Sequence, residues 1–389
     1  MRDVVIAGIG QTDVAEHWEI SLRELALYAL EAAMQDAGGL RPNALYVGNM
    51  LAGSLSHQIH LGALLADFAG LHSIEAAQIE AAGASGAMAL RMGALAVASG
   101  SVDAALVLGV EKLSDQVASQ VEAALAWATD TDYEAEQGLT ASAQAAMLAQ
   151  RYMHEYSVPE HALAGFPLTA HANAVPNRHA MFRRAVKPEL YAKAAMVSAP
   201  LNMFDIAPNA DGAAAVLLTR PELLPPKFPH PLIEVAGSSA VTDTLALHDR
   251  PQPLSFNAAR LSVERATKEA GISPKDADFF ELFDAFSIYS ALSMEAAGFA
   301  KAGEGWKLAQ NGKIQLDGEM PISTMGGLKA RGFPGGATGV YQVVESVLQL
   351  RGEAGDSQVK GASQALVQSL GGPASTAVTH VLRTAHATD

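Results

Sequence analysis

The chain has 389 residues, a formal net charge of −15, 49% hydrophobic residues and 17% charged residues. This is the composition of a globular protein, and the length exceeds what one core usually holds, so two domains or two similar halves are expected. The acidic balance disfavours nucleic acid and anionic membranes as partners, and the absence of cysteine from the sequence excludes disulfides, thiolate metal sites and thiol catalysis.

The first elements alternate between strand and helix. Residues 4–8 predict a short buried strand, and the N-terminal residues are expected to form this strand and not a signal peptide. Ser21 and Glu24 form a capping-box pattern that opens a helix ending near Gly38, and residues 44–48 predict the next strand. The longest apolar tracts are interrupted by charges such as Arg91 and Asp103, so no membrane span is expected and a cytoplasmic protein is indicated.

The second half of the chain repeats this order. Residues 232–237 predict a strand, residues 255–269 a helix and residues 278–282 another strand. Two glycine-rich turns, at 83–86 and 336–339, each open a helix, and apolar strands follow at 104–110, 365–367 and 377–382. Nearly continuous apolar strands indicate sheets covered on both faces. The repeat predicts a pseudo-twofold duplication with the two glycine-rich helices buried near its centre.

A less regular insertion lies between the halves, with a helix expected over 139–156. Residues 171–193 carry five basic side chains and one acid, Glu189, which gives a local net charge of +4 (5 minus 1) in an acidic chain. Histidines and an asparagine, among them His171, interleave with these charges. Such a basic segment favours a phosphate-bearing ligand; a solvated loop or a subunit contact is the alternative. The basic residues are Arg178, Arg183, Arg184, Lys187 and Lys193.

Six segments in register resemble the thiolase superfamily, especially its archaeal and sterol-carrier-protein-type branch. They are residues 80–90, 102–114, 202–216, 281–286 (ELFDAF), 326–339 (GGLKARGFPGGATG) and 370–372. The resemblance implies an α/β fold with five layers, α/β/α/β/α, built from two duplicated halves (1–114 with 205–228, and 229–389) and a loop domain inserted at 115–204. It also implies a homodimer or higher oligomer and an acyl-CoA substrate, with coenzyme A as part of the substrate and no bound cofactor. His171, Arg178, Arg183, Arg184 and Lys187 would contact the coenzyme.

Four catalytic positions of the family are changed in this chain. The cysteine that accepts the acyl group corresponds to Gly83, and two family histidines correspond to Phe283 and Phe333. The C-terminal loop, where many relatives carry a second cysteine, has Ser369. Glycine has no side chain to acylate and phenylalanine transfers no proton, so cysteine-dependent chemistry is excluded at Gly83.

Backbone amides and tyrosines are the remaining candidates. The N–H groups of Gly83, Gly371 and Gly372 are candidates for an oxyanion hole. Tyr341 and Tyr289 are candidate acid/base residues, although a packed ring with a satisfied hydroxyl is the alternative for each. No metal site is expected, because His57 and His60 have no accompanying carboxylate-rich motif.

Three functions follow from the resemblance. A cysteine-free aldolase would cleave a 3-hydroxyacyl-CoA by a retro-aldol reaction, together with a partner that has an OB-fold and a zinc ribbon. Phe283 and Phe333 would make its pocket suited to a bulky acyl group. Alternatively, the chain is a non-catalytic subunit that binds acyl-CoA or completes a complex. Conventional acyl-CoA C-acyltransferase activity is a third reading that the loss of the cysteine disfavours.

Overall fold

The structure, a computed structural model, describes residues 4–385. Nine strands form one mixed sheet in the order β3-β2-β4-β7-β1-β8-β11-β10-β9. Their bounds are β1 (Val5–Gln11), β2 (Ala44–Gly48), β3 (Glu75–Ile79), β4 (Ala104–Glu111), β7 (Gly212–Thr219), β8 (Ile233–Thr242), β9 (Phe279–Glu281), β10 (Gln364–Gly371) and β11 (Thr376–Thr384). A separate two-stranded sheet contains β5 (Met196–Ser198) and β6 (Leu201–Asn202).

The helices fall into two groups. Those that pack on the sheet include α1 (Leu22–Asp36), α3 (Leu61–Phe68), α4 (Ser85–Ala98), α9 (Asn257–Ala270) and α12 (Thr338–Arg351). The others are α2 (Ala52–Leu55), α5 (Ala118–Ala126), α6 (Ala141–Tyr156), α7 (Gly165–Ala174), α8 (Pro188–Ala192), α10 (Ser287–Ala296) and α11 (Gly305–Leu308). Among residues 4–385, no helix is both long and apolar enough to cross a membrane.

The two halves repeat one strand pattern, which confirms the predicted duplication. In the first half β1 and β4 flank β7 in antiparallel pairing, and β2 is parallel to β4. In the second half β8 and β10 flank β11 in antiparallel pairing, and β9 is parallel to β10. A parallel bridge between Phe280 and Ile322 stands beside β9 as β3 stands beside β2.

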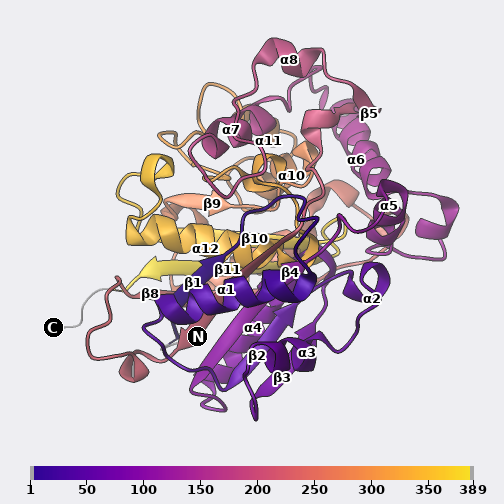
Figure 1. Ribbon diagram of the computed structural model, residues 1–389. Coiled ribbons are helices and arrows are strands. Elements are labelled where there is room, and N and C mark those ends of the chain that lie inside the picture. Colours follow the sequence, from indigo (N-terminus) through magenta and orange to yellow (C-terminus); the bar gives the residue numbers. More distant parts are fainter. Residues whose placement is uncertain (1–3, 386–389) are drawn as a thin grey trace.

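The layers follow the predicted α/β/α/β/α order. Helices α1 and α3 cover the outer face of the first half-sheet, α9 packs outside the second with α10 against it, and α4 and α12 contact strands of both (Figure 1). The half-sheets are hydrogen-bonded to each other, because Val5 pairs with Glu234 and Ile6 with Ile233. The sheet therefore continues from one half to the other around the central helices.

The central helices approach each other closely, as the glycine-rich turns predict. A Cβ atom on Gly86 of α4 would lie 2.8 Å from the carbonyl oxygen of Gly336, and one on Gly339 of α12 would lie 2.4 Å from the amide nitrogen of Ala87. Real side chains do not tolerate such distances, so only glycine permits this crossing. The turns that precede α4 and α12 are thereby held near the centre of the molecule.

The inserted segment forms a separate group of helices above one end of the sheet, with α5 to α8 and the small sheet (Figure 1). The helix expected over 139–156 is α6, whose first turn is capped by the Thr140 side chain. The Tyr152 hydroxyl of α6 donates a hydrogen bond to Glu295 of α10 at 2.5 Å. This bond fixes the inserted segment to the second half of the fold.

Candidate functional site

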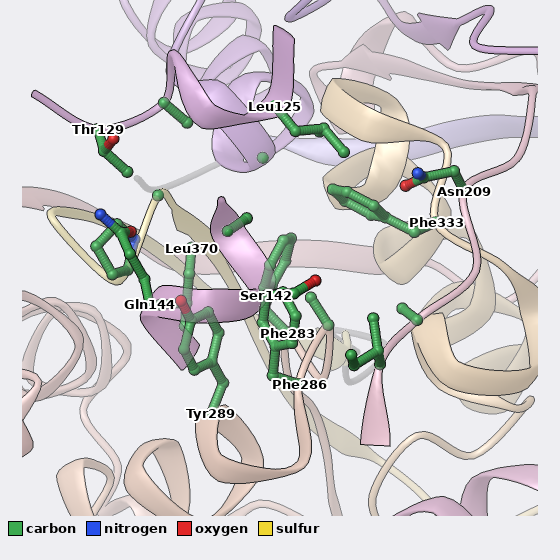
Figure 2. Close-up of a pocket in the computed structure, with 18 of the residues that line it drawn as sticks. Leu125, Thr129, Ser142, Gln144, Asn209, Phe283, Phe286, Tyr289, Phe333 and Leu370 are labelled. Atoms are coloured by element: carbon green, nitrogen blue, oxygen red, sulfur yellow. The ribbon is translucent and has the colours of Figure 1, made fainter. Parts of the chain in front are cut away.

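The Gly83 turn borders an inner cavity of ≈ 70 Å³. The turn follows β3 as a short 3-10 helix over Ala82–Ala84, and Ala82 has a left-handed φ of 50°. Most of the cavity wall is apolar, with Met50, Leu125, Ile206, Phe283, Phe286, Phe333 and Leu370 among its residues (Figure 2). A cavity of this volume does not support the expectation of a bulky acyl group.

The two phenylalanines at the family's histidine positions both line this cavity. Their rings meet edge to face, with centroids 5.8 Å apart and an interplanar angle of 88°. A Cβ atom on Gly83 would lie 2.7 Å from Cζ of Phe283 and 2.7 Å from the carbonyl oxygen of Leu370. Phe283 thus occupies the space that a side chain at position 83 would need.

The three glycines suggested for the oxyanion hole do not all lie at the cavity. Gly83 and Gly372 line the cavity, whereas Gly371 does not. Gly371 pairs with Thr376 in the β10–β11 ladder, and a Cβ atom on it would lie 2.5 Å from the carbonyl oxygen of Ala81. The geometry therefore retains Gly83 and Gly372 as candidate donors and gives Gly371 a packing role.

Ser369 also lies away from the cavity. Its hydroxyl donates to the side-chain oxygen of Gln342 at 2.5 Å in the core, and it is fully buried. The strand alternation of β10 turns this side chain to the α12 face of the sheet. Ser369 therefore cannot replace the second cysteine found in relatives.

Tyr289, in the first turn of α10, lines the inner cavity. Its ring is fixed by edge-on contacts with Phe286, at 5.0 Å between centroids, and with Phe256, at 5.4 Å. Burial raises the pKa of Tyr289 far above its usual value. The hydroxyl is therefore a neutral hydrogen-bond donor, and its environment opposes the activation that a tyrosine base would need.

Tyr341 lies elsewhere, contrary to the expectation that it approaches the pocket. Its ring is fully buried beneath the guanidinium of Arg331, whose Cζ is 5.0 Å from the ring centroid. The hydroxyl donates to the carbonyl oxygen of Thr12 at 3.1 Å and lies 3.1 Å from the Thr12 hydroxyl. Tyr341 is not among the residues lining the inner cavity. Helix α12 turns this side chain toward β1 and β7, so its position argues for a packing role.

Five polar cavity residues were not identified from the sequence, namely Glu122, Thr129, Ser142, Gln144 and Asn209. The half-buried Glu122 of α5 accepts a hydrogen bond from Asn209 at 3.3 Å, and both line the cavity. Gln144 of α6 is 1% exposed. One signal for Gln144 was available, because it continues the buried stripe of Leu148 and Tyr152 at four-residue spacing. A polar residue in such a buried stripe indicates that its side chain has a specific role.

A larger groove of ≈ 740 Å³ adjoins the inner cavity. The two share Glu122, Ser142, Ile206 and Ala207, so they lie side by side, and Gly83 lines the inner one. Of the basic residues expected to contact coenzyme A, His171 and Arg184 line this groove. Lys329, which the sequence did not single out for this role, also lines it.

The other basic residues are dispersed. Arg178 lines a separate groove with His179 and Asp36, and its Nε lies 3.0 Å from Nε2 of His179. Arg183 and Lys187 are exposed and line neither the inner cavity nor the larger groove. The basic segment is therefore not a single site, because α7 and the loop after it turn its side chains to different faces.

The inner end of the groove is polar but weakly charged. Burial, with a smaller effect of the Lys329 charge, lowers the pKa of His171 to about 4, and Nδ1 of this ring has no partner among the described residues. Burial also lowers the pKa of Lys329 to about 8, while its Nζ donates to the carbonyl oxygen of Asp205 at 2.7 Å. A neutral acceptor and an ammonium donor thus lie in one wall.

Comparisons with known proteins match the whole length of the fold. The family model for the thiolase N-terminal domain matches residues 4–222, and that for the thiolase C-terminal domain-like family matches residues 239–384. The chain is 41% identical to an acetyl-CoA acetyltransferase of Methanothermobacter thermautotrophicus, over 98% of this chain and 99% of the relative. It is 31% identical to the benzoylsuccinyl-CoA thiolase subunit BbsB of Thauera aromatica, over 92% of each.

Two solved structures share the fold. The structure described as "Ltp2-ChsH2(DUF35) aldolase" has a TM-score of 0.85 at 22% identity and covers 98% of both chains. Human mitochondrial 3-ketoacyl-CoA thiolase in complex with CoA has a TM-score of 0.74 at 17% identity, over 99% of this chain and 98% of that chain. At these identities the likeness concerns the fold alone.

Proposed function

The chain belongs to the thiolase superfamily, and we propose that it acts on a coenzyme A thioester without an acyl-enzyme at Gly83, as an aldolase that breaks or forms the C2–C3 bond of a 3-hydroxyacyl-CoA. The observation that carries this proposal is that position 83 has no side chain and that the Phe283 ring fills the space beside it. The Phe283 ring stands 2.7 Å from a Cβ position on Gly83, while Glu122 and Tyr289 remain on the cavity wall. The nucleophile is gone, but a carboxylate and a phenol that can handle protons are present.

A retro-aldol reaction fits these groups. Glu122 takes the proton of the 3-hydroxyl, C3 becomes a carbonyl carbon, and the electron pair of the breaking C2–C3 bond forms the thioester enolate. The N–H groups of Gly83 and Gly372 stabilise the enolate oxygen, and the neutral Tyr289 hydroxyl donates to the oxygen on C3. The enolate then takes the proton back from Glu122 at C2, which yields the shortened acyl-CoA. No acyl-enzyme is needed.

Coenzyme A binding is proposed along the larger groove. Arg184 at its rim provides a cation for a phosphate, and His171 and Lys329 provide an acceptor and a donor for the amides of the pantetheine arm. Coenzyme A would be part of the substrate, and no resident cofactor is proposed.

Oligomers and partners remain part of the same proposal. The description "Ltp2-ChsH2(DUF35) aldolase" names a second protein beside the aldolase chain. We therefore propose that this chain forms a homodimer or higher oligomer and works with an OB-fold and zinc-ribbon partner, in the cytoplasm.

A second candidate is a non-catalytic subunit that binds acyl-CoA. The crossed rings of Phe283 and Phe333 favour it, because they leave an inner cavity of only ≈ 70 Å³. Conventional acyl-CoA C-acyltransferase activity is disfavoured by Gly83, although the Methanothermobacter relative is described as an acetyl-CoA acetyltransferase.

The test is turnover of 3-hydroxyacyl-CoA esters by the natively purified protein with any co-purifying partner, with the shortened acyl-CoA detected by mass spectrometry. Cleavage that falls about 10²–10⁴-fold in Glu122→Gln, and not in the exposed control Glu136→Gln, supports the aldolase with Glu122 as its base. Binding of the esters without turnover overturns the aldolase and leaves the non-catalytic subunit.

A further inference from the structure

Gln144 lines the inner cavity, and its side-chain amide nitrogen is buried and unpaired within the described part of the chain. The residue is 1% exposed, and its Nε2 atom has no hydrogen-bond partner among residues 4–385. Figure 2 shows it between Thr129 and Leu370 on the cavity wall. Buried side-chain amides nearly always have a partner, so an unpaired one on a cavity calls for an acceptor from outside the chain.

The amide is held in place by the helices that carry it. Gln144 lies in the first turn of α6, where Thr140 caps the helix by accepting from the Ala143 amide at 3.2 Å. Farther along α6, Tyr152 donates to Glu295 of α10, and Glu295 also accepts from the Gly305 amide at 2.7 Å. Because Tyr289 begins the same helix α10, this connection also sets its position relative to Gln144.

The other residues of the cavity wall indicate which kind of hydrogen-bond acceptor would pair with Gln144. Phe283, Phe286, Phe333 and Leu370 offer no hydrogen-bonding group from their side chains. The polar side chains on the wall are those of Glu122, Thr129, Ser142, Gln144, Asn209 and Tyr289. A purely apolar acyl group would leave the amide unsatisfied. An acyl group with an oxygen beyond its thioester would satisfy it, and a volume of ≈ 70 Å³ limits that group to a few carbons.

We propose that Gln144 is the specificity-determining residue of this cavity, selecting a short acyl group that carries a hydroxyl or carbonyl oxygen beyond the thioester. The proposal rests on the proposed function, since it takes the occupant to be an acyl-CoA. Gln144 binds and orients the distal oxygen beside the Tyr289 hydroxyl, and takes no proton. Unsubstituted acyl groups of the same length bind more weakly because they leave the buried amide unpaired.

The test compares two esters of equal length, 3-hydroxybutyryl-CoA and butyryl-CoA, by isothermal titration calorimetry on the natively purified protein carrying Glu122→Gln, which blocks the proposed cleavage of the hydroxylated ester. We expect the hydroxylated ester to bind about tenfold more tightly, as one hydrogen bond to a buried group allows. In Gln144→Leu the ratio should fall to about one, because butyryl-CoA keeps its affinity and only the hydroxylated ester loses. Gln150→Leu is the control, since Gln150 is exposed on the same helix and its side chain donates to Ala199 instead.

The outcomes separate the specificity proposal from the proposed function. Equal affinities for the two esters in the Glu122→Gln protein overturn the role of Gln144 and leave acyl-CoA binding intact. If neither ester binds, acyl-CoA recognition itself fails and the inference fails with it. Gln144→Met keeps a side chain of similar length without an amide donor, so it should also abolish the ratio. A folded Gln144→Met variant that keeps the tenfold preference would contradict the proposal.

Discussion

Phe283 lies where a side chain on residue 83 would stand, with its Cζ atom 2.7 Å from the Cβ position of Gly83. Reintroducing the family's cysteine alone should therefore fail. We expect Gly83→Cys to reduce the free energy of unfolding by about 1–3 kcal/mol through overpacking, and its thiol to react slowly with iodoacetamide. Urea denaturation and mass spectrometry of the alkylated protein measure the two effects.

The double variant Gly83→Cys/Phe283→Ala is the companion to this test. It should alkylate faster than Gly83→Cys, because the ring that covers the thiol is removed. The Leu370 carbonyl oxygen still lies 2.7 Å from the Cβ position, so part of the instability should persist. The natural sequence has no cysteine, so alkylation reports on position 83 alone. A single variant that is fully stable and rapidly alkylated would contradict the geometry.

The two tyrosines should respond differently to loss of the hydroxyl. Tyr341→Phe loses the contacts with Thr12 and should lower the free energy of unfolding by about 1 kcal/mol without changing kcat. Tyr289→Phe should leave stability nearly unchanged and reduce turnover of a 3-hydroxyacyl-CoA by about tenfold or more. Urea denaturation and steady-state kinetics on both variants test this contrast. Loss of turnover in Tyr341→Phe alone would reverse the assignment.

Arg184 and Arg178 form a matched pair for coenzyme A binding. Both belong to the basic segment, but only Arg184 lines the groove that adjoins the inner cavity. We expect Arg184→Gln to weaken CoA-ester binding by about threefold to tenfold, with a smaller effect at high salt because the side chain is exposed. Arg178→Gln should bind as the natural protein does. Calorimetric titrations of a CoA ester at two salt concentrations test this contrast. Equal effects of both substitutions would show that the groove is not the coenzyme A site.

His380 predicts an acid-sensitive contribution to stability. Its ring lies between the Ser238 hydroxyl and the Ala87 carbonyl oxygen, each at 3.0 Å, and burial lowers its pKa to about 4 from the usual 6.5. The unfolded chain takes up this proton at higher pH than the folded one. The contribution is therefore complete above pH 6.5 and is lost as the pH falls toward 4, by roughly 3 kcal/mol in all.

The pH dependence of urea denaturation tests this contribution. In His380→Gln the decrease in stability between pH 6.5 and 4 should be shallower than in the natural protein. His248→Gln, at an exposed histidine, should keep the original slope. An unchanged slope in His380→Gln would show that the buried ring does not govern acid stability.

The repeat was readable from the sequence because strand and helix patterns are local. The same holds for the Ser21–Glu24 capping box, which the structure confirms. Site residues depend on tertiary packing: Glu122 and Gln144 belong to no motif, and they meet Gly83 only because the inserted helices fold over the turn. Tyr341 was misjudged because closeness to the glycine-rich turn in sequence does not tell which side of α12 faces the cavity.

The crossing of α4 and α12 depends on Gly86 and Gly339, whose backbones touch the opposite helix, whereas a Cβ atom on Gly83 would meet the Phe283 ring and the Leu370 carbonyl oxygen. A substitution at Gly86 therefore disturbs the packing of the two central helices more than a substitution at Gly83. A side chain at Gly86 would push the two halves of the molecule apart. Residue 83 can change its identity when a neighbouring side chain such as Phe283 fills the space. The residues that maintain the fold are therefore distinct from the residue at the nucleophile position, so the chemistry can change in evolution while the fold is kept.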